Sequence, residues 1–218
     1  MSVTEMETMM GLARAAAAGG APGRCLRLPV VDPDAADLWL QRGKRGGEVV
    51  DGVRHTKAEC FQKAATADPN RADSWFYLGR AAGGEVMGKW YTERDCFERA
   101  LSIDPSHSPA WTWLGDEDGG TVEGKFYDEK QCYAQAIALD AANAEPWGLL
   151  GVSGGGVVAG RSYTEKECYE QALMRNPGHA RAWNWLGKCG GGTVNGRFYD
   201  ATECDRNWMP VKRKSNFD

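Results

Sequence analysis

The sequence predicts an all-α solenoid built from five stacked repeats. Shifted by 36 residues, the sequence matches itself without a gap, so that tryptophan, cysteine and glycine return in register. Each repeat also contains two amphipathic helical segments, and one such pair cannot bury its apolar face alone, so the pairs must stack. The recurring residues include Trp39, Trp75, Trp111, Trp147, Trp183, Cys60, Cys96, Cys132, Cys168 and Cys204.

The repeat also sets the expected domain boundaries. Residues 1–31 precede the first copy and are expected to form a capping or docking segment, with a targeting sequence as the alternative. The tail, residues 208–218, contains the basic run Lys212-Arg213-Lys214. Such a run is usually solvated, and the alternatives are a nuclear import signal or a contact to an acidic partner. The five repeats are expected at 32–67, 68–103, 104–139, 140–175 and 176–207, the last being a degenerate cap.

The first helix of a repeat is expected to start at an Asp-Pro or Asn-Pro pair. Such a pair supplies a side-chain acceptor, followed by a proline whose missing N–H costs nothing in the first turn. In the third copy Trp111, Leu114 and Gly115 then follow at helical spacing, and the glycine allows close approach of the second helix. The pairs are Asp32-Pro33, Asp68-Pro69, Asp104-Pro105 and Asn176-Pro177.

A glycine-rich connector follows, and then a second helix. Asp51-Gly52 and Asn195-Gly196 favour a primed two-residue turn, so a small β-like hairpin or tight excursion is expected in every repeat. The second helix begins with an N-cap residue and a partner three residues later, which is the spacing of a capping box. These pairs are Thr56/Glu59, Thr92/Asp95, Asp128/Gln131, Thr164/Glu167 and Asp200/Glu203.

Composition narrows the possible partners and the compartment. The net charge of −4 gives no electrostatic reason to expect nucleic acid or an anionic membrane, and no apolar run is long enough to span a bilayer. Periodic cysteines in adjacent repeats would lie about 8–10 Å apart, beyond the roughly 7 Å limit for a disulfide. Buried free thiols indicate an intracellular reducing compartment, with the cytoplasm expected first and the nucleus or an organelle as alternatives.

Motifs for chemistry are not found. The glycine runs lack the Gly-Lys-Ser/Thr of a phosphate loop. No Cys-x-x-Cys motif occurs, and the spacing of His55, His107 and His179 does not indicate a metal site. Cys189 and His179 would be about 15 Å apart on a helix, too far for a catalytic pair. We therefore expect no enzyme activity, no cofactor, no metal and no small-molecule substrate.

The repeat resembles the tetratricopeptide family. That family keeps an aromatic residue, Leu-Gly, a second aromatic, an alanine and a late proline at comparable spacing. The resemblance covers residues 32–205, but the period here exceeds the family's 34 or so residues, and the longer Gly-rich turn is similar to that of Sel1-like relatives. It implies a right-handed α-solenoid that binds other proteins on a concave face formed by the first helices. The matching residues are Trp75, Leu78, Gly79, Phe97, Ala100, Leu101, Asp104 and Pro105.

By position, this face would be lined by residues just after each first-helix tryptophan and one or two turns further on. They differ between copies while the framework stays constant, as expected of a binding surface. The alternative is that Trp113 and Trp185 are extra core. The expected lining is Leu40, Lys44, Phe76, Tyr77, Arg80, Thr112, Trp113, Asp116, Val152, Asn184, Trp185 and Lys188.

The sequence thus predicts a non-catalytic scaffold or a structural subunit of a larger assembly. Its partner would be a helix or an extended segment of another protein, held by aromatic anchors. Single-stranded RNA is the alternative partner, because helical repeats can read one base per repeat. An RNA reader needs a basic groove, whereas Arg80, Asp116 and Lys188 are mixed in sign.

Overall fold

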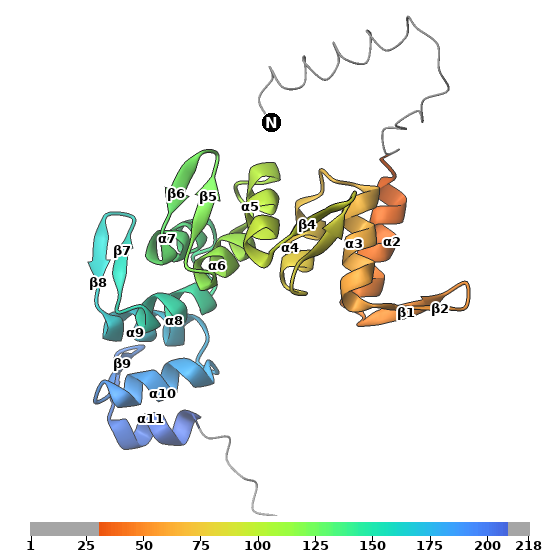
Figure 1. Cartoon of the computed structure of the whole chain (residues 1–218). Helices are drawn as coiled ribbons and strands as arrows, with labels where there is room; N and C mark the ends of the chain where they lie inside the picture. The colour runs from red at the N-terminus through yellow and green to blue at the C-terminus, as the bar shows by residue number, and fades with distance from the viewer. Residues whose placement is uncertain (1–30, 209–218) are drawn as a thin grey trace, which may run out of the picture. The chain divides into compact units, whose positions relative to one another are not determined.

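The computed structural model describes residues 31–208 of the chain (Figure 1). The segments before and after, with the expected capping segment and basic tail, lie outside the described residues. Within this range the chain is mostly helical, and consecutive helices pack against each other. The expected all-α class needs a correction, because every repeat also contains a pair of antiparallel strands.

Each repeat consists of a first helix (A), a two-stranded hairpin and a second helix (B). The A helices are α2 (Pro33–Lys44), α4 (Ala72–Gly79), α6 (Ser108–Asp116), α8 (Glu145–Val152) and α10 (Ala180–Lys188). The B helices are α3 (Lys57–Ala67), α5 (Glu93–Ile103), α7 (Glu129–Leu139), α9 (Glu165–Arg175) and α11 (Ala201–Trp208).

The hairpins confirm the turn prediction. Both central residues of each turn have positive φ, for example 51° at Asn195 and 78° at Gly196, as a primed turn requires. Copies two to four place Met87, Glu123 and Ala159 in this left-handed region. The strand pairs are β1 (Gly47–Val50) with β2 (Val53–Thr56), β3 (Gly84–Val86) with β4 (Lys89–Tyr91), β5 (Gly120–Val122) with β6 (Lys125–Tyr127), β7 (Gly156–Val158) with β8 (Arg161–Tyr163), and β9 (Gly192–Val194) with β10 (Arg197–Tyr199).

Helix starts are only partly as predicted. The B helices α3, α5, α7 and α9 begin with the predicted capping box, and Asp200 and Glu203 form the same two hydrogen bonds at the start of α11. Asp32 also caps α2 as expected. In the third copy, however, α6 starts at Ser108 rather than at the Asp-Pro pair: Asp104 ends the preceding helix and accepts the Ser106 N–H, and His107 caps α6. In the second, third and fifth copies the proline pair therefore marks the turn between repeats, and only in the first copy does it start the helix.

A close approach between glycine and an aromatic ring fixes the two helices of a repeat together. A Cβ atom added at Gly115 would lie 2.6 Å from the ring of Tyr133, which is buried on α7. The same contact joins Gly79 to Phe97 in the second copy. In the fifth copy Asp205 replaces the ring, and a Cβ at Gly187 meets nothing closer than 3.2 Å. The predicted role of this glycine is confirmed.

The A-helix tryptophans of copies two to five are core residues, and Trp39 of the first copy is half-buried. Trp111 is 4% exposed, donates its Nε1–H to the Pro105 carbonyl at 2.8 Å and packs edge-on against Tyr127 of the hairpin. The repeating cysteines of the B helices are also buried, and all are free. In the fourth copy Arg175 hydrogen-bonds to the carbonyl of Ala141, the residue standing where the proline would be. Each repeat thus has an apolar core built from its own helix pair and hairpin.

Stacking covers the apolar faces that one repeat leaves open. Each B helix packs against the A helix of the next copy, as α5 does against α6 and α7 against α8. The hairpin of the next copy also rests on that B helix, as β5 does on α5. Within residues 31–208, no helix is long and apolar enough to cross a membrane.

Candidate functional site

The variable positions of the A helices divide into buried and exposed groups. Leu40, Phe76 and Thr112 are only 2%, 5% and 5% exposed, so they cannot present a side chain to a partner. The structure corrects the expectation for these three residues, because in the first three copies the position directly after the tryptophan faces inward. Phe76, for example, packs against Phe97 and His107. The exposed or half-buried residues are Lys44, Tyr77, Arg80, Trp113, Asp116, Val152, Asn184, Trp185 and Lys188.

At the first two junctions between consecutive repeats, a cation of one A helix covers an aromatic ring of the next A helix. The Lys44 ammonium lies 4.4 Å from the ring centroid of Tyr77, one repeat further on. The Arg80 guanidinium lies 4.4 Å from the ring centroid of Trp113 in the same way. A cation held over an aromatic face is favourable, so a partner would have to displace it in order to use these rings. These two junctions are therefore closed in the free protein.

The later junctions are built differently. Asp116 and Val152 stand where Lys44 and Arg80 stand in the first two copies, and Leu149 stands where Tyr77 stands in the second. Neither an aspartate nor a valine can cover a neighbouring ring as a cation does. No cation of the preceding repeat therefore covers a ring along α8 and α10, although the Lys188 ammonium of α10 itself lies 3.8 Å from the ring centroid of Trp185.

A hollow of about 220 Å³ lies on α8 and α10, and Gly148 explains it. In the second copy the equivalent residue is Phe76, whose ring fills this place. Gly148 has no side chain, and a Cβ atom added there would meet only the ring of His179, at 3.4 Å. The apolar lining comprises Gly148, Leu149, Val152, Tyr169, Ala182 and Trp185.

A charged network forms the rim of the hollow. The Nδ1 atom of His179 accepts the Ala182 N–H at 3.2 Å and so caps α10. This fixes the tautomer, because the Nε2–H must then donate to Glu145, 3.1 Å away. Arg181 reaches the same carboxylate at 3.7 Å. The hydrogen bond from His179 lowers the pKa of Glu145 below its usual value.

His107 and His179 occupy the same repeat position. His107 caps α6 through Nδ1 and pairs with Asp73 through Nε2 at 3.2 Å. The hydrogen bond lowers the pKa of Asp73 as it does that of Glu145. At the sequence level the two histidines were considered as metal ligands, and His179 also as a catalytic partner of Cys189. Their role in the structure is to cap a helix and to bond to the preceding repeat.

A small second hollow continues the site towards α6. It has a volume of about 60 Å³ and shares Glu145, Leu149 and Arg181 with the larger one. Trp113 and Asp116 complete its lining together with the buried Thr112. The two hollows of the A-helix face therefore extend over α6, α8 and α10.

Sequence reasoning named Val152 and Trp185 but missed other lining residues, Gly148 and Leu149 among them. A glycine and a leucine in a helix carry no chemical signal of their own. The signal that could have found them is the comparison of copies at one repeat position, which shows a glycine where another copy has Phe76.

The thiols of residues 31–208 are not arranged for nucleophilic chemistry. Burial raises the pKa of Cys96, Cys132 and Cys168 to about 12. Burial also raises the pKa of Cys189, and the nearby Glu165 carboxylate adds to the effect. Since the thiolate is the reactive form, these cysteines are poor nucleophiles near neutral pH. Within residues 31–208, no three metal-ligating side chains lie together.

Comparison with known proteins gives little beyond this geometry. No family model matches the chain, and no curated protein matches its sequence. Among solved structures, the chain is similar to one titled "Crystal structure of MamA protein", with a TM-score of 0.45 and 18% sequence identity. The match covers 80% of this chain and 85% of that one. Function is therefore inferred from the A-helix face alone.

Proposed function

We propose that this chain is a non-catalytic protein-interaction module. Its five repeats would stack as a right-handed α-solenoid, as the resemblance to tetratricopeptide repeats implies. The open A-helix face would bind a helix or an extended segment of another protein, and the chain would serve as a scaffold or subunit of a larger assembly. The free, buried thiols support a reducing compartment inside the cell.

One observation carries this proposal: the apolar hollow that Gly148 opens beside Trp185. An apolar side chain of the partner would enter it and bury its surface against Leu149, Tyr169 and Trp185. A half-buried tryptophan beside an open hollow is typical of an interface anchor, because its large rigid surface is already partly ordered. The rest of the face would exclude water around this anchor.

The charged rim supports a peptide partner. Glu145 and Arg181 place an acceptor and donors at the edge of the hollow, where main-chain groups of a bound segment would lie. The network around Glu145 already exists in the free protein, so little ordering is needed on binding. RNA is the less favoured partner, because the cations Lys44 and Arg80 are held on the protein's own rings.

The test compares three forms of the full chain as bait in an extract of the native cells. The wild type and Gly148→Ala keep the hollow open, whereas Gly148→Phe fills it with the ring found in the second copy. Protein partners that copurify stoichiometrically with the first two forms and are lost from the third support the proposal. A partner retained equally by all three forms binds elsewhere and contradicts the proposed face.

A parallel arm of the same experiment tests the RNA alternative. Each extract is divided, and one half is treated with RNase before capture. Partners lost after RNase treatment, or RNA recovered with a steep dependence on salt, would replace the protein proposal by the nucleic-acid one. A further variant, Trp185→Ala, should weaken capture while leaving the helical circular dichroism signal unchanged. Loss of folding in that variant would mean that Trp185 is a core residue instead.

A further inference from the structure

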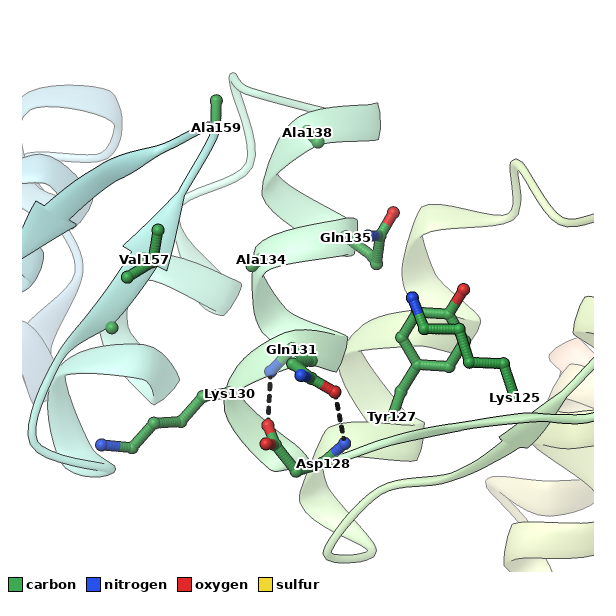
Figure 2. Close-up of a pocket in the computed structure, with 11 residues that line it drawn as sticks. Lys125, Tyr127, Asp128, Lys130, Gln131, Ala134, Gln135, Ala138, Val157 and Ala159 are labelled. Carbon is green, nitrogen blue, oxygen red and sulfur yellow. Dashed lines mark hydrogen bonds between the residues drawn. The ribbon is translucent and has the colours of Figure 1, made fainter.

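A second groove lies over helix α7, between the hairpins of the third and fourth repeats (Figure 2). Its floor is formed by the short side chains of Ala134 and Ala138, and its volume is about 560 Å³. Val157 of β7 lines one side, and Lys125 of β6 lines the other. None of these residues lines the hollow at Gly148, so the groove is a separate feature.

The neighbouring junctions show what fills this place in the same fold. In the second copy the Glu98 carboxylate accepts the N–H of Thr121, on the next hairpin, at 2.6 Å. In the fourth copy the Glu170 carboxylate accepts the N–H of Thr193 at 2.7 Å. The equivalent residue of the third copy is Ala134. Its methyl group cannot accept a hydrogen bond.

Strand register shows that the Val157 N–H points out of its hairpin. Val158 and Arg161 flank the two-residue turn and form a hydrogen-bonded pair. The next pair, Val157 with Ser162, is then non-hydrogen-bonded, and its main-chain groups point to the outside of the ladder. Val157 is thus equivalent to Thr121 and Thr193. It offers an N–H to the groove, but the glutamate that occupies that place in other copies is missing.

Charge in the groove favours an anion. Lys125 and Lys130 both line it, and the Lys130 stem lies against Gly156 of β7. The one carboxylate among the lining residues belongs to Asp128, which accepts the Gln131 N–H at 2.8 Å in the capping box of α7 (Figure 2). The groove therefore combines a main-chain donor with two lysine side chains around an apolar floor. The Lys125 ammonium lies 4.5 Å from the ring centroid of Tyr127 and would have to leave it to meet a bound anion.

We propose that this groove binds an acidic segment of a partner protein. A glutamate or aspartate side chain of the partner would accept the Val157 N–H, as the Glu98 and Glu170 carboxylates accept the equivalent groups within the chain. The Lys130 ammonium would lie beside the bound carboxylate. The small residues Ala134 and Ala138 leave room for the peptide that carries it. The site uses residues distinct from the A-helix face, so each proposal can fail without the other.

Nuclear magnetic resonance of the full chain tests the proposal at the amide itself. The protein is labelled with ¹⁵N-valine and titrated with a blocked five-residue peptide that has glutamate at its centre and alanine elsewhere. We expect a saturable shift of the Val157 amide signal, and binding about tenfold weaker for the same peptide with glutamine, because hydrogen bonds to charged acceptors are the stronger ones. An unmoved Val157 signal, or equal binding of both peptides, overturns the proposal.

Sodium acetate is the third probe, because it supplies a carboxylate without a peptide. Much weaker binding of acetate than of the glutamate peptide supports a peptide site. Acetate binding as tight as that of the peptide overturns it, since the groove would then accept any free carboxylate.

Two variants test the assignment by closing this groove and by opening an equivalent groove at the next junction between repeats. Ala134→Glu supplies the carboxylate from within the chain and should remove peptide binding while keeping or raising the melting temperature. Glu170→Ala should create an equivalent groove in front of Thr193 and give it a peptide-dependent amide shift, read with ¹⁵N-threonine labelling. The assignment would be contradicted if the peptide still shifted the Val157 amide in Ala134→Glu. It would also be contradicted if the peptide did not shift the Thr193 amide in a folded Glu170→Ala protein.

Discussion

Replacing Gly148 by phenylalanine should stabilise the protein. The second copy of the repeat shows the expected outcome, because Phe76 occupies this position with 5% of its surface exposed. Its ring centroid lies 6.2 Å from that of Phe97 and 4.9 Å from that of His107. In the fourth copy, Tyr169 and His179 stand in the places of these two partners. A ring at residue 148 would therefore meet the same kind of surroundings.

The size of the effect follows from burial and helix propensity. Fully burying a phenylalanine side chain contributes about 1.5–3 kcal/mol. Replacing a glycine inside a helix by phenylalanine adds roughly 0.5 kcal/mol. Because the hollow is open on one side, we expect a gain near the lower end, about 2 kcal/mol. For a chain of this size, that gain raises the melting temperature by roughly 4–8 °C.

Thermal unfolding followed by circular dichroism measures this gain. Gly148→Ala is the matched control, because it removes the glycine without filling the hollow and should gain about 1 kcal/mol from helix propensity alone. The difference between the two variants then reports the burial of the ring. A Gly148→Phe protein that melts below Gly148→Ala would refute the reasoning, since the ring would not fit between α8 and α10.

The remaining predictions concern the framework. Gly115→Ala should lower the unfolding free energy by about 1–3 kcal/mol, because its methyl group collides with the buried ring of α7, whereas Gly187→Ala should be nearly neutral; urea unfolding of both tests the contrast. Glu123→Asn should stabilise by about 0.5–1 kcal/mol in the same assay, because asparagine tolerates the left-handed turn position. The lowered pKa of Glu145 contributes stability that is present above its unfolded pKa of about 4.5 and is lost as the pH falls through the lower folded value. Melting temperatures of the wild type should therefore fall more steeply below pH 5 than those of Glu145→Gln, and parallel curves would mean that the bond from His179 contributes nothing to folding.

Short-range features of this fold were predictable from sequence. The turn at Asn195-Gly196 requires positive φ at two successive residues, a preference that lies in the residues themselves. The capping box from Thr164 to Glu167 closes over three residues, so neighbouring repeats have little influence on it. Such interactions join residues within a few positions of each other. The same short sequence pattern therefore produces the same secondary structure in every copy.

The start of the A helices was not predictable in the same way. Asparagine and aspartate before proline are good N-caps, but in the third and fifth copies the cap is His107 or His179. A histidine caps a helix only if its Nδ1 atom is an acceptor. That tautomer is fixed here by Asp73 and Glu145, each in the preceding repeat. A contact between repeats thus decides a local boundary.

The candidate binding face depends still more on tertiary structure. The sequence by itself determined the 36-residue repeat, the helix–hairpin–helix order and the close approach of the two helices at the glycine of the first helix, because these depend on residues within one copy. Only the tertiary structure decided that Phe76 is buried, and that Gly148 at the same position leaves a hollow beside Trp185. Which side of an A helix meets solvent depends on how the next repeat packs against it, and that packing joins residues more than 30 positions apart in the chain.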